Sequence, residues 1–239
     1  METTSATGES FTGDSLGLSR FLNRGSVLFC VITAMFFNPE LPLRKHLNHL
    51  PHWQQDSAWV FITWRLADSV PAGLLEKWIA DRDEWMSQHE KPWDEDTERE
   101  FRIRFSAQLE EWMDQGMGEC VLRNSACAEL VARTILHFDR ERYLIDGFVI
   151  MPNHVHLLVQ LVPGFPLETL VHSWKRYSAR QINEVLGRSG KLWHKRYWDT
   201  LVRSEEHFWK IRRYISRNPV KAGLAENEYL LYLPWDEKG

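Results

Sequence analysis

The stretch YLIDGFVIMPNHVHLLVQLV, residues 143–162, decides the fold that the sequence predicts. Two runs rich in β-branched and apolar residues, Tyr143–Ile150 and His154–Val162, are separated only by the turn signal Met151-Pro152-Asn153. So short a connection predicts that the two runs pair as an antiparallel hairpin. We therefore expect a sheet with this hairpin at its centre.

Two histidines begin the second strand of this hairpin. Residues i and i+2 of a strand point to the same face, so His154 and His156 are expected to stand side by side where a turn enters the sheet. Paired imidazoles of this kind are typical of ligands for one metal ion, whereas an isolated HxH is more often a pair of ordinary core or surface histidines. Two histidines are too few for most metal sites, so this pattern requires a third ligand.

The remaining periodicities predict an α+β fold. Further strands are expected at Ser57–Ala67 and Trp198–Val202, and helices at Leu74–Met86, Thr97–Met113, Ser125–Phe138 with Ser125 as N-cap, Leu167–Leu186, and from Ser204 to Asn218 with Pro219 as the stop. With an acidic helical insertion of residues 75–138 after the first strand set aside, the order is βαββαβ. That is a ferredoxin-like antiparallel sheet with flanking helices and an added C-terminal helix.

The chain divides into three expected parts. Residues 1–49 form an N-terminal extension whose Ser-, Thr- and Gly-rich beginning suggests partial disorder. Residues 50–225 form the main domain, and residues 226–239 form a C-terminal tail.

The last helix carries a candidate third ligand and a candidate nucleophile. Tyr214 and Asn218 are four residues apart and share one helix face. If that face packs over the two histidines, Asn218 Oδ1 would be the third ligand and Tyr214 would lie above the same ion. A divalent cation that polarises a phosphate, together with a base that takes the proton, makes attack by a tyrosine oxygen feasible. The alternative is that Tyr214, between Ile211 and Ile215, is a core or capping aromatic.

Charge is distributed unevenly along the chain. Residues 171–224 carry five Lys and eight Arg against three Glu and one Asp, which indicates a polyanion partner, whereas residues 75–100 carry ten acidic and four basic side chains. Basic residues neutralise phosphates, and the interleaved aromatics stack on unpaired bases. The candidate DNA contacts are Lys175, Arg176, Arg180, Trp193, Lys195, Arg196, Lys210, Arg212, Arg213, Arg217 and Lys221. Two alternatives stay open: the tryptophans of residues 193–198 anchor the core, and the acidic segment is a solvated face, a lid, a partner surface or a shield.

Cysteine usage and hydropathy indicate the cellular location that is expected for the protein. The cysteines are Cys30, Cys120 and Cys127, an odd number without CxxC spacing, so a reduced, cytoplasmic protein is expected. The apolar run of residues 27–37 has 11 residues, fewer than the roughly 20 needed to span a bilayer, so no membrane partner is expected. The sequence does not distinguish a monomer from a homodimer.

Several motifs together resemble a known family. MPNHVHLLV (151–159), SWKRYSA (173–179), GKLWHKRYWDTLVR (190–203) and RRYISRNPVKAGL (212–224) resemble the REP-associated tyrosine transposases, which are single-tyrosine HUH transposases. LPHW (50–53) and FITWRLADSVP (61–71) look like the first strand region of that family. The resemblance spans about residues 50–224; residues 1–49 have no clear counterpart, and the insertion after the first strand is long.

The resemblance implies a fold, an activity and a set of site residues. The fold would be ferredoxin-like, and the activity would be metal-dependent cleavage and joining of single-stranded DNA that contains repetitive palindromic hairpins of bacterial genomes. Tyr214 falls on the family's nucleophile, which forms a 5′-phosphotyrosyl intermediate, and His154, His156 and Asn218 fall on its ligands for Mg²⁺ or Mn²⁺. Two alternatives from other classes are a hairpin-binding regulator without catalysis and a metal phosphoesterase that uses water as nucleophile.

Overall fold

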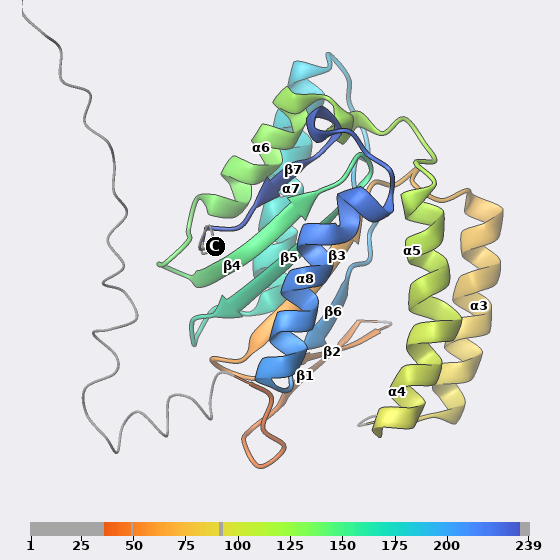
Figure 1. The fold of residues 1–239 in the computed structure, drawn as a ribbon, viewed down its shortest axis with the longest axis vertical. Coiled ribbons are helices and arrows are strands. Elements are labelled where there is room, and N and C mark those ends of the chain that lie inside the picture. Colours follow the sequence, from red (N-terminus) through yellow and green to blue (C-terminus); the bar gives the residue numbers. More distant parts are fainter. Residues whose placement is uncertain (1–35, 49, 91–92, 235–239) are drawn as a thin grey trace, which may run out of the picture.

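The computed structural model describes residues 36–48, 50–90 and 93–234 (Figure 1). Most of the expected N-terminal extension, including Cys30, lies outside the described residues. The elements in chain order are β1 (Arg44–Asn48), β2 (Leu50–Gln54), β3 (Trp59–Arg65), α3 (Ala72–Gln88), α4 (Glu95–Phe101), α5 (Ala107–Asp114), α6 (Ser125–Leu136), β4 (Tyr143–Ile150), β5 (His154–Leu161), α7 (Leu167–Val185), β6 (Trp198–Leu201), α8 (Glu205–Lys221) and β7 (Leu230–Tyr232).

The main sheet has five strands in the order β6-β3-β5-β4-β7, and every neighbouring pair is antiparallel. Its first four strands have the order of a ferredoxin-like sheet, so the predicted fold is confirmed. The 143–162 hairpin forms as expected, with β4 paired to β5. Three strands lie outside the predicted plan: β1 and β2 pair as a separate hairpin, and β7 adds an edge strand from the segment predicted to be a tail.

The two faces of the sheet are covered by different helices (Figure 1). Val155, Leu157 and Val159 of β5 lie in the larger core together with residues of α6 and α7. Leu158 lies in a second core with Ile211 and Ile215 of α8. Because alternate residues of a strand point to opposite faces, the two histidines of β5 lie on the α8 side.

The expected insertion of residues 75–138 divides into two parts. Helix α6 packs against α7 and the sheet, so it serves as the first helix of the βαββαβ plan. The preceding helices α3, α4 and α5 form a separate small core around Trp78, Trp85 and Phe105. A π-helical turn, Arg102–Ser106, joins α4 to α5.

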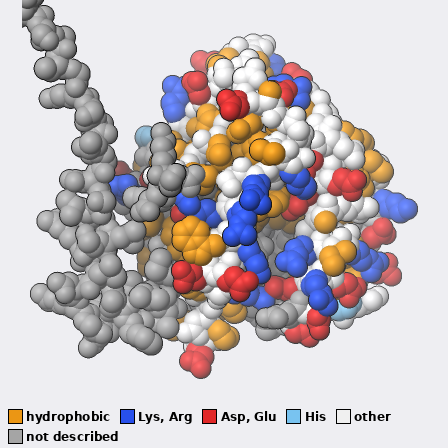
Figure 2. All heavy atoms as spheres, viewed as in Figure 1, with side chains coloured by type: hydrophobic (Ala, Val, Ile, Leu, Met, Phe, Trp, Pro, Cys, Tyr) orange, Lys and Arg blue, Asp and Glu red, His pale blue; other side chains and the backbone are white. Residues whose placement is uncertain are grey.

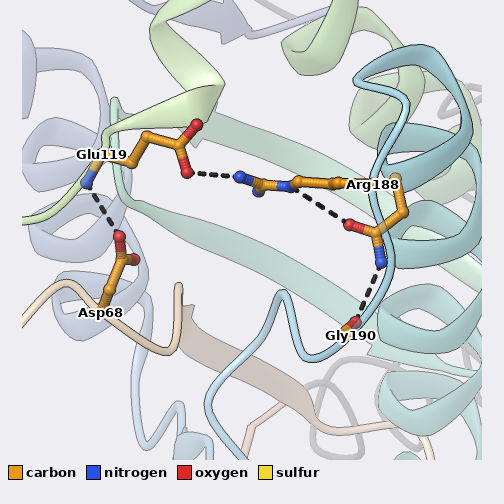
Figure 3. Close-up of polar contacts among 5 residues, drawn as sticks. Asp68, Glu119, Arg188 and Gly190 are labelled. Atoms are coloured by element: carbon orange, nitrogen blue, oxygen red, sulfur yellow. Dashed lines mark hydrogen bonds and ion pairs between the residues drawn. The ribbon is translucent and has the colours of Figure 1, made fainter.

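The two ends of this α3–α5 excursion are fastened together at its base (Figure 3). The Asp68 carboxylate accepts a hydrogen bond of 2.8 Å from the backbone N–H of Glu119. The Glu119 side chain forms an ion pair with Arg188, which follows α7. Gly118, with a φ of +87°, allows this approach, because an added Cβ would lie 2.7 Å from the backbone oxygen of Asp68. The excursion is therefore a closed loop whose helices are held next to the sheet.

Two helix ends differ from the sequence prediction. Helix α6 is capped by Asn124, whose side chain accepts from the Ala126 N–H, and not by Ser125. Helix α8 continues through Pro219 to Lys221. A proline so close to a helix end removes only one internal hydrogen bond, and the turn beyond it still forms. Among the described residues, no helix has the length and apolar character required to cross a membrane.

The close approach of the C-terminal segment to β4 generates a stability prediction. At Gly147, beside a register shift in β4, an added Cβ would lie 2.5 Å from Leu233 Cδ2 and 3.0 Å from the Tyr232 oxygen. Gly147→Ala should therefore lower the free energy of unfolding in urea by about 1–3 kcal/mol. The control is Gly73→Ala, where no atom lies within 4 Å of the new Cβ. Equal stability of the two variants would contradict the packing described here.

Candidate active site

The two histidines of β5 are each held by a hydrogen bond to Nδ1. His154 Nδ1 lies 2.7 Å from Asn153 Oδ1, and His156 Nδ1 lies 2.7 Å from Thr63 Oγ1. Thr63 is the cross-strand partner of His156 on β3, so the pairing of β3 with β5 sets this contact. Such bonds fix the orientation of an imidazole and leave its Nε2 free to bind a ligand.

The protonation state of His154 follows from the neighbouring amide. Asn153 Nδ2 donates to the backbone oxygens of Met113 and Met117, at 3.1 and 3.2 Å, so Asn153 Oδ1 faces His154 and accepts from Nδ1–H. His154 Nε2 then carries the lone pair, and it is buried without a hydrogen-bond partner among the described residues. Burial, and then the charge of Lys221, lower the pKa of His154 to about 3. Burial also holds the pKa of His156 well below its ordinary value, so both rings are neutral near pH 7.

Helix α8 brings Tyr214 and Asn218 over these rings. The Tyr214 hydroxyl lies 3.3 Å from His156 Nε2, and Asn218 Nδ2 lies 3.4 Å from the same atom. Asn218 is buried, and its Oδ1 has no hydrogen-bond partner in the described part of the chain. Ile211 and Ile215, which flank Tyr214 in sequence, pack on the sheet and leave Tyr214 only partly buried at the rim of the site.

The side chains of His154, His156 and Asn218 carry nitrogen and oxygen donors of the kind that bind divalent cations. His154 Nε2 and Asn218 Oδ1 are both buried without a hydrogen-bond partner among the described residues, and a half-turn of the Asn218 amide directs Oδ1 toward His156. Within the described residues, no group of three or more His, Cys, Asp and Glu side chains is arranged to hold a metal, so a metal site here would need the amide as its third ligand. Three such ligands would leave coordination positions open for substrate oxygens.

Helix α5 of the insertion adds negative charge beside Tyr214. Burial raises the pKa of the Tyr214 phenol, and the carboxylates of Glu110 and Asp114 raise it further. Asp114 Oδ2 accepts a hydrogen bond of 2.9 Å from Lys221 Nζ at the end of α8. The phenol is therefore neutral at rest and requires activation before it can attack an electrophile.

A cleft of about 410 Å³ opens beside Tyr214, between α8, β6 and the α4–α5 arm of the insertion. Its walls carry aromatic rings from three parts of the chain, including Phe61, Phe101 and Trp198. The charged side chains at its walls are the cations Arg102, Arg203 and Lys210 and the carboxylates Glu98, Glu110 and Asp199. Figure 2 shows Lys and Arg side chains gathered along the face over α8, where Lys210, Arg213 and Arg217 are exposed.

The structure separates the predicted DNA contacts into groups. Lys210, Arg213, Arg217 and Lys221 lie on α8, next to Tyr214. Arg176 and Arg180 are exposed on α7, which covers the opposite face of the sheet. Lys195 is exposed and Arg196 is half-buried in the loop that precedes β6.

Three of the predicted DNA contacts have partners within the protein, and the burial of Trp193 corrects the prediction that this ring stacks on DNA. Trp193 is buried and donates from Nε1 to Ser178 Oγ at 3.0 Å, so it cannot stack on a base. Lys175 donates to the backbone oxygens of His194 and Lys195, and burial lowers its pKa to about 8. Arg212 forms a nearly buried ion pair with Asp146 of β4 at 3.1 Å.

Three residues of the site were not found from the sequence. The sequence offers a signal for Asn153, because this residue directly precedes His154 and its side-chain amide can hydrogen-bond the neighbouring ring. Thr63 and Glu110 have none, because strand register and the docking of the insertion bring them to the site from distant parts of the chain.

The different environments of two neighbouring arginines generate a second prediction. Arg212→Ala should lower the free energy of unfolding by about 3 kcal/mol, because it removes one partner of a buried ion pair. Arg213→Ala changes an exposed side chain and should stay within about 0.5 kcal/mol of the wild type. Chemical denaturation measures both, and equal losses would contradict the assignment of Arg212 to the core.

The candidate site lies in a stretch of the chain that matches a transposase family. The family described as Transposase IS200 like matches residues 124–218, which include both histidines, Tyr214 and Asn218. No curated protein matches the chain. A structure of a REP-associated tyrosine transposase bound to a REP hairpin is 15% identical, with a TM-score of 0.44, over 75% of this chain and 77% of that one. A putative transposase from Deinococcus radiodurans R1 is 17% identical, with a TM-score of 0.33, over 67% of this chain and 89% of that one. The family match over residues 124–218 confirms the resemblance to transposases that the sequence motifs indicate.

Proposed function

We propose that the protein is a transposase that cuts and rejoins single-stranded DNA at palindromic hairpins, with Tyr214 as the nucleophile. The observation that carries this proposal is the position of the Tyr214 hydroxyl, 3.3 Å from His156 Nε2 and on the same helix face as Asn218. A phosphate bound at the two histidines would meet the phenol directly. The transposase match over this region supports the same assignment.

His154, His156 and Asn218 would hold Mg²⁺ or Mn²⁺, which when bound polarises the phosphate and offsets the charge that develops during attack. The histidines are suited to this role because both are already neutral, so binding a cation displaces no proton from them. Asn153 and Thr63 keep the two rings oriented.

The chain's own residues would position the DNA. Arg213 and Arg217, exposed on either side of Tyr214 along α8, would bind backbone phosphates. Lys221, which pairs with Asp114 at the end of α8, adds positive charge near the histidines. Tyr214 attack would give a 5′-phosphotyrosyl bond and a free 3′-OH, and attack by a 3′-OH would reverse the step. The covalent intermediate conserves the phosphodiester energy, so no nucleotide is consumed.

The cleft beside Tyr214 would accept unpaired bases that flank the hairpin. Aromatic rings stack on bases with little sequence preference, and Phe61, Phe101 and Trp198 present rings to the cleft from β3, α4 and β6.

Covalent capture tests the nucleophile. When protein, labelled single-stranded hairpin DNA and Mn²⁺ are combined, the wild type should give an adduct that survives denaturing electrophoresis, and Tyr214→Phe should give none. Tyr177→Phe, which changes an exposed tyrosine on α7, is the matched control and should react as the wild type does. Adduct in the Tyr214→Phe protein would exclude this nucleophile. Hairpin affinity that EDTA does not change, with no adduct under any metal, would favour the catalytically inactive regulator.

Removal of the Thr63 hydroxyl tests the metal site. Thr63→Val keeps the side-chain shape but loses the 2.7 Å contact to His156 Nδ1, so Mn²⁺ affinity measured by calorimetry should fall about 10- to 100-fold. Thr200→Val, at an exposed position of the neighbouring strand β6, should bind Mn²⁺ as the wild type does. Equal affinity of all three proteins would count against a cation at His156.

A further inference from the structure

We propose that Glu110, on insertion helix α5, is a catalytic residue that accepts the proton of the Tyr214 hydroxyl as this oxygen attacks the phosphate. This inference rests on the proposed function and deepens it, because it gives the insertion a chemical role at the active site. The acidic segment shows no ligand or catalytic spacing in the sequence, so only the fold reveals the residue.

The facing sides of α5 and α8 bring Glu110 and Tyr214 to one cleft. Glu110 and Asp114 are one turn apart on α5, and Tyr214 and Lys221 are two turns apart on α8, so each pair lies on one helix face. The hydrogen bond of 2.9 Å between Lys221 Nζ and Asp114 Oδ2 joins these faces, and the two helices run in the same direction (Figure 1). One turn before that contact Glu110 faces the same cleft as Tyr214.

The position of Glu110 does not depend on its own side chain. The backbone oxygen of Met113 accepts from Asn153 Nδ2 at 3.1 Å, which fixes α5 to the turn that orients His154. Farther along the same arm, Glu98 forms an ion pair with Arg203, and Asp68 binds the backbone of Glu119 at the base of the insertion. Replacing the Glu110 carboxylate should therefore leave α5 in place.

The environment of Glu110 suits a proton acceptor. Burial raises the pKa of the Glu110 carboxyl, with Lys221 opposing the shift, so Glu110 is a stronger base than an exposed glutamate. A stronger base takes up a proton more readily in the transition state, which favours the proposed role.

The step balances without another reactant. The Tyr214 O–H bond breaks, its electron pair forms the bond to phosphorus, and the proton passes to the Glu110 carboxylate. The P–O bond to the 3′ oxygen breaks, and that oxygen takes a proton from water. In the rejoining step a 3′-OH forms the new bond to phosphorus and gives its proton to water, while the bond from phosphorus to the tyrosine oxygen breaks and this oxygen recovers its proton from Glu110.

The test compares adduct formation by four full-length proteins with saturating hairpin DNA and Mn²⁺. Glu110→Gln keeps the size of the side chain but removes the base, so its rate of adduct formation should fall about 100-fold. Its hairpin affinity and its midpoint of thermal unfolding should match the wild type. Glu110→Asp retains a carboxylate and should recover part of the rate. Glu111→Gln, at the adjacent exposed position of α5, is the matched control and should react as the wild type does.

Each other outcome has a separate meaning. A wild-type rate in Glu110→Gln would overturn the role of Glu110 while the proposed function stands. A loss of rate that is matched by loss of hairpin affinity or of thermal stability would also overturn it, since Glu110 would then act only on structure. Absence of adduct in the wild type itself would contradict the proposed function, and the inference would fall with it.

Discussion

The candidate site depends on the register between β3 and β5. In this register Thr63 stands opposite His156 and holds its ring, and both histidines face α8. A slip of one residue would turn both imidazoles toward the α6–α7 core, because side chains alternate between the faces of a strand. The apolar residues of β5 that fill that core, among them Val155 and Leu157, fix the register and so direct the histidines to the site.

Helix α8 links packing to chemistry in a similar way. Ile211 and Ile215 fill the second core, and this leaves Tyr214 and Asn218 facing the histidines. The insertion completes the enclosure: α5 is fixed to the turn before His154 and to the end of α8 by contacts that are independent of one another. A segment that interrupts the ferredoxin-like plan thus forms one wall of the site, and its acidic character places carboxylates next to the phenol.

The sequence predicted the parts of this fold that depend on local pattern. The hairpin of residues 143–162 and the start of α8 at Ser204 follow from alternation, turn chemistry and helix-start signals, and both form. The predictions that failed depend on contacts between parts of the chain that are distant in sequence. The basic-aromatic run around Trp193 has the same composition whether its rings stack on bases or fill a core, and here Trp193 is buried. Glu110 could not be found from the sequence, because it reaches the cleft only through the packing of the insertion next to α8.

The most direct measurement of the central claim is anomalous diffraction from crystals of the protein soaked with Mn²⁺. The account predicts one strong peak in bonding contact with His154 Nε2, His156 Nε2 and the side-chain oxygen of Asn218, beneath the Tyr214 hydroxyl. A peak at other residues, or none at the histidines under conditions in which the protein reacts with hairpin DNA, would contradict it.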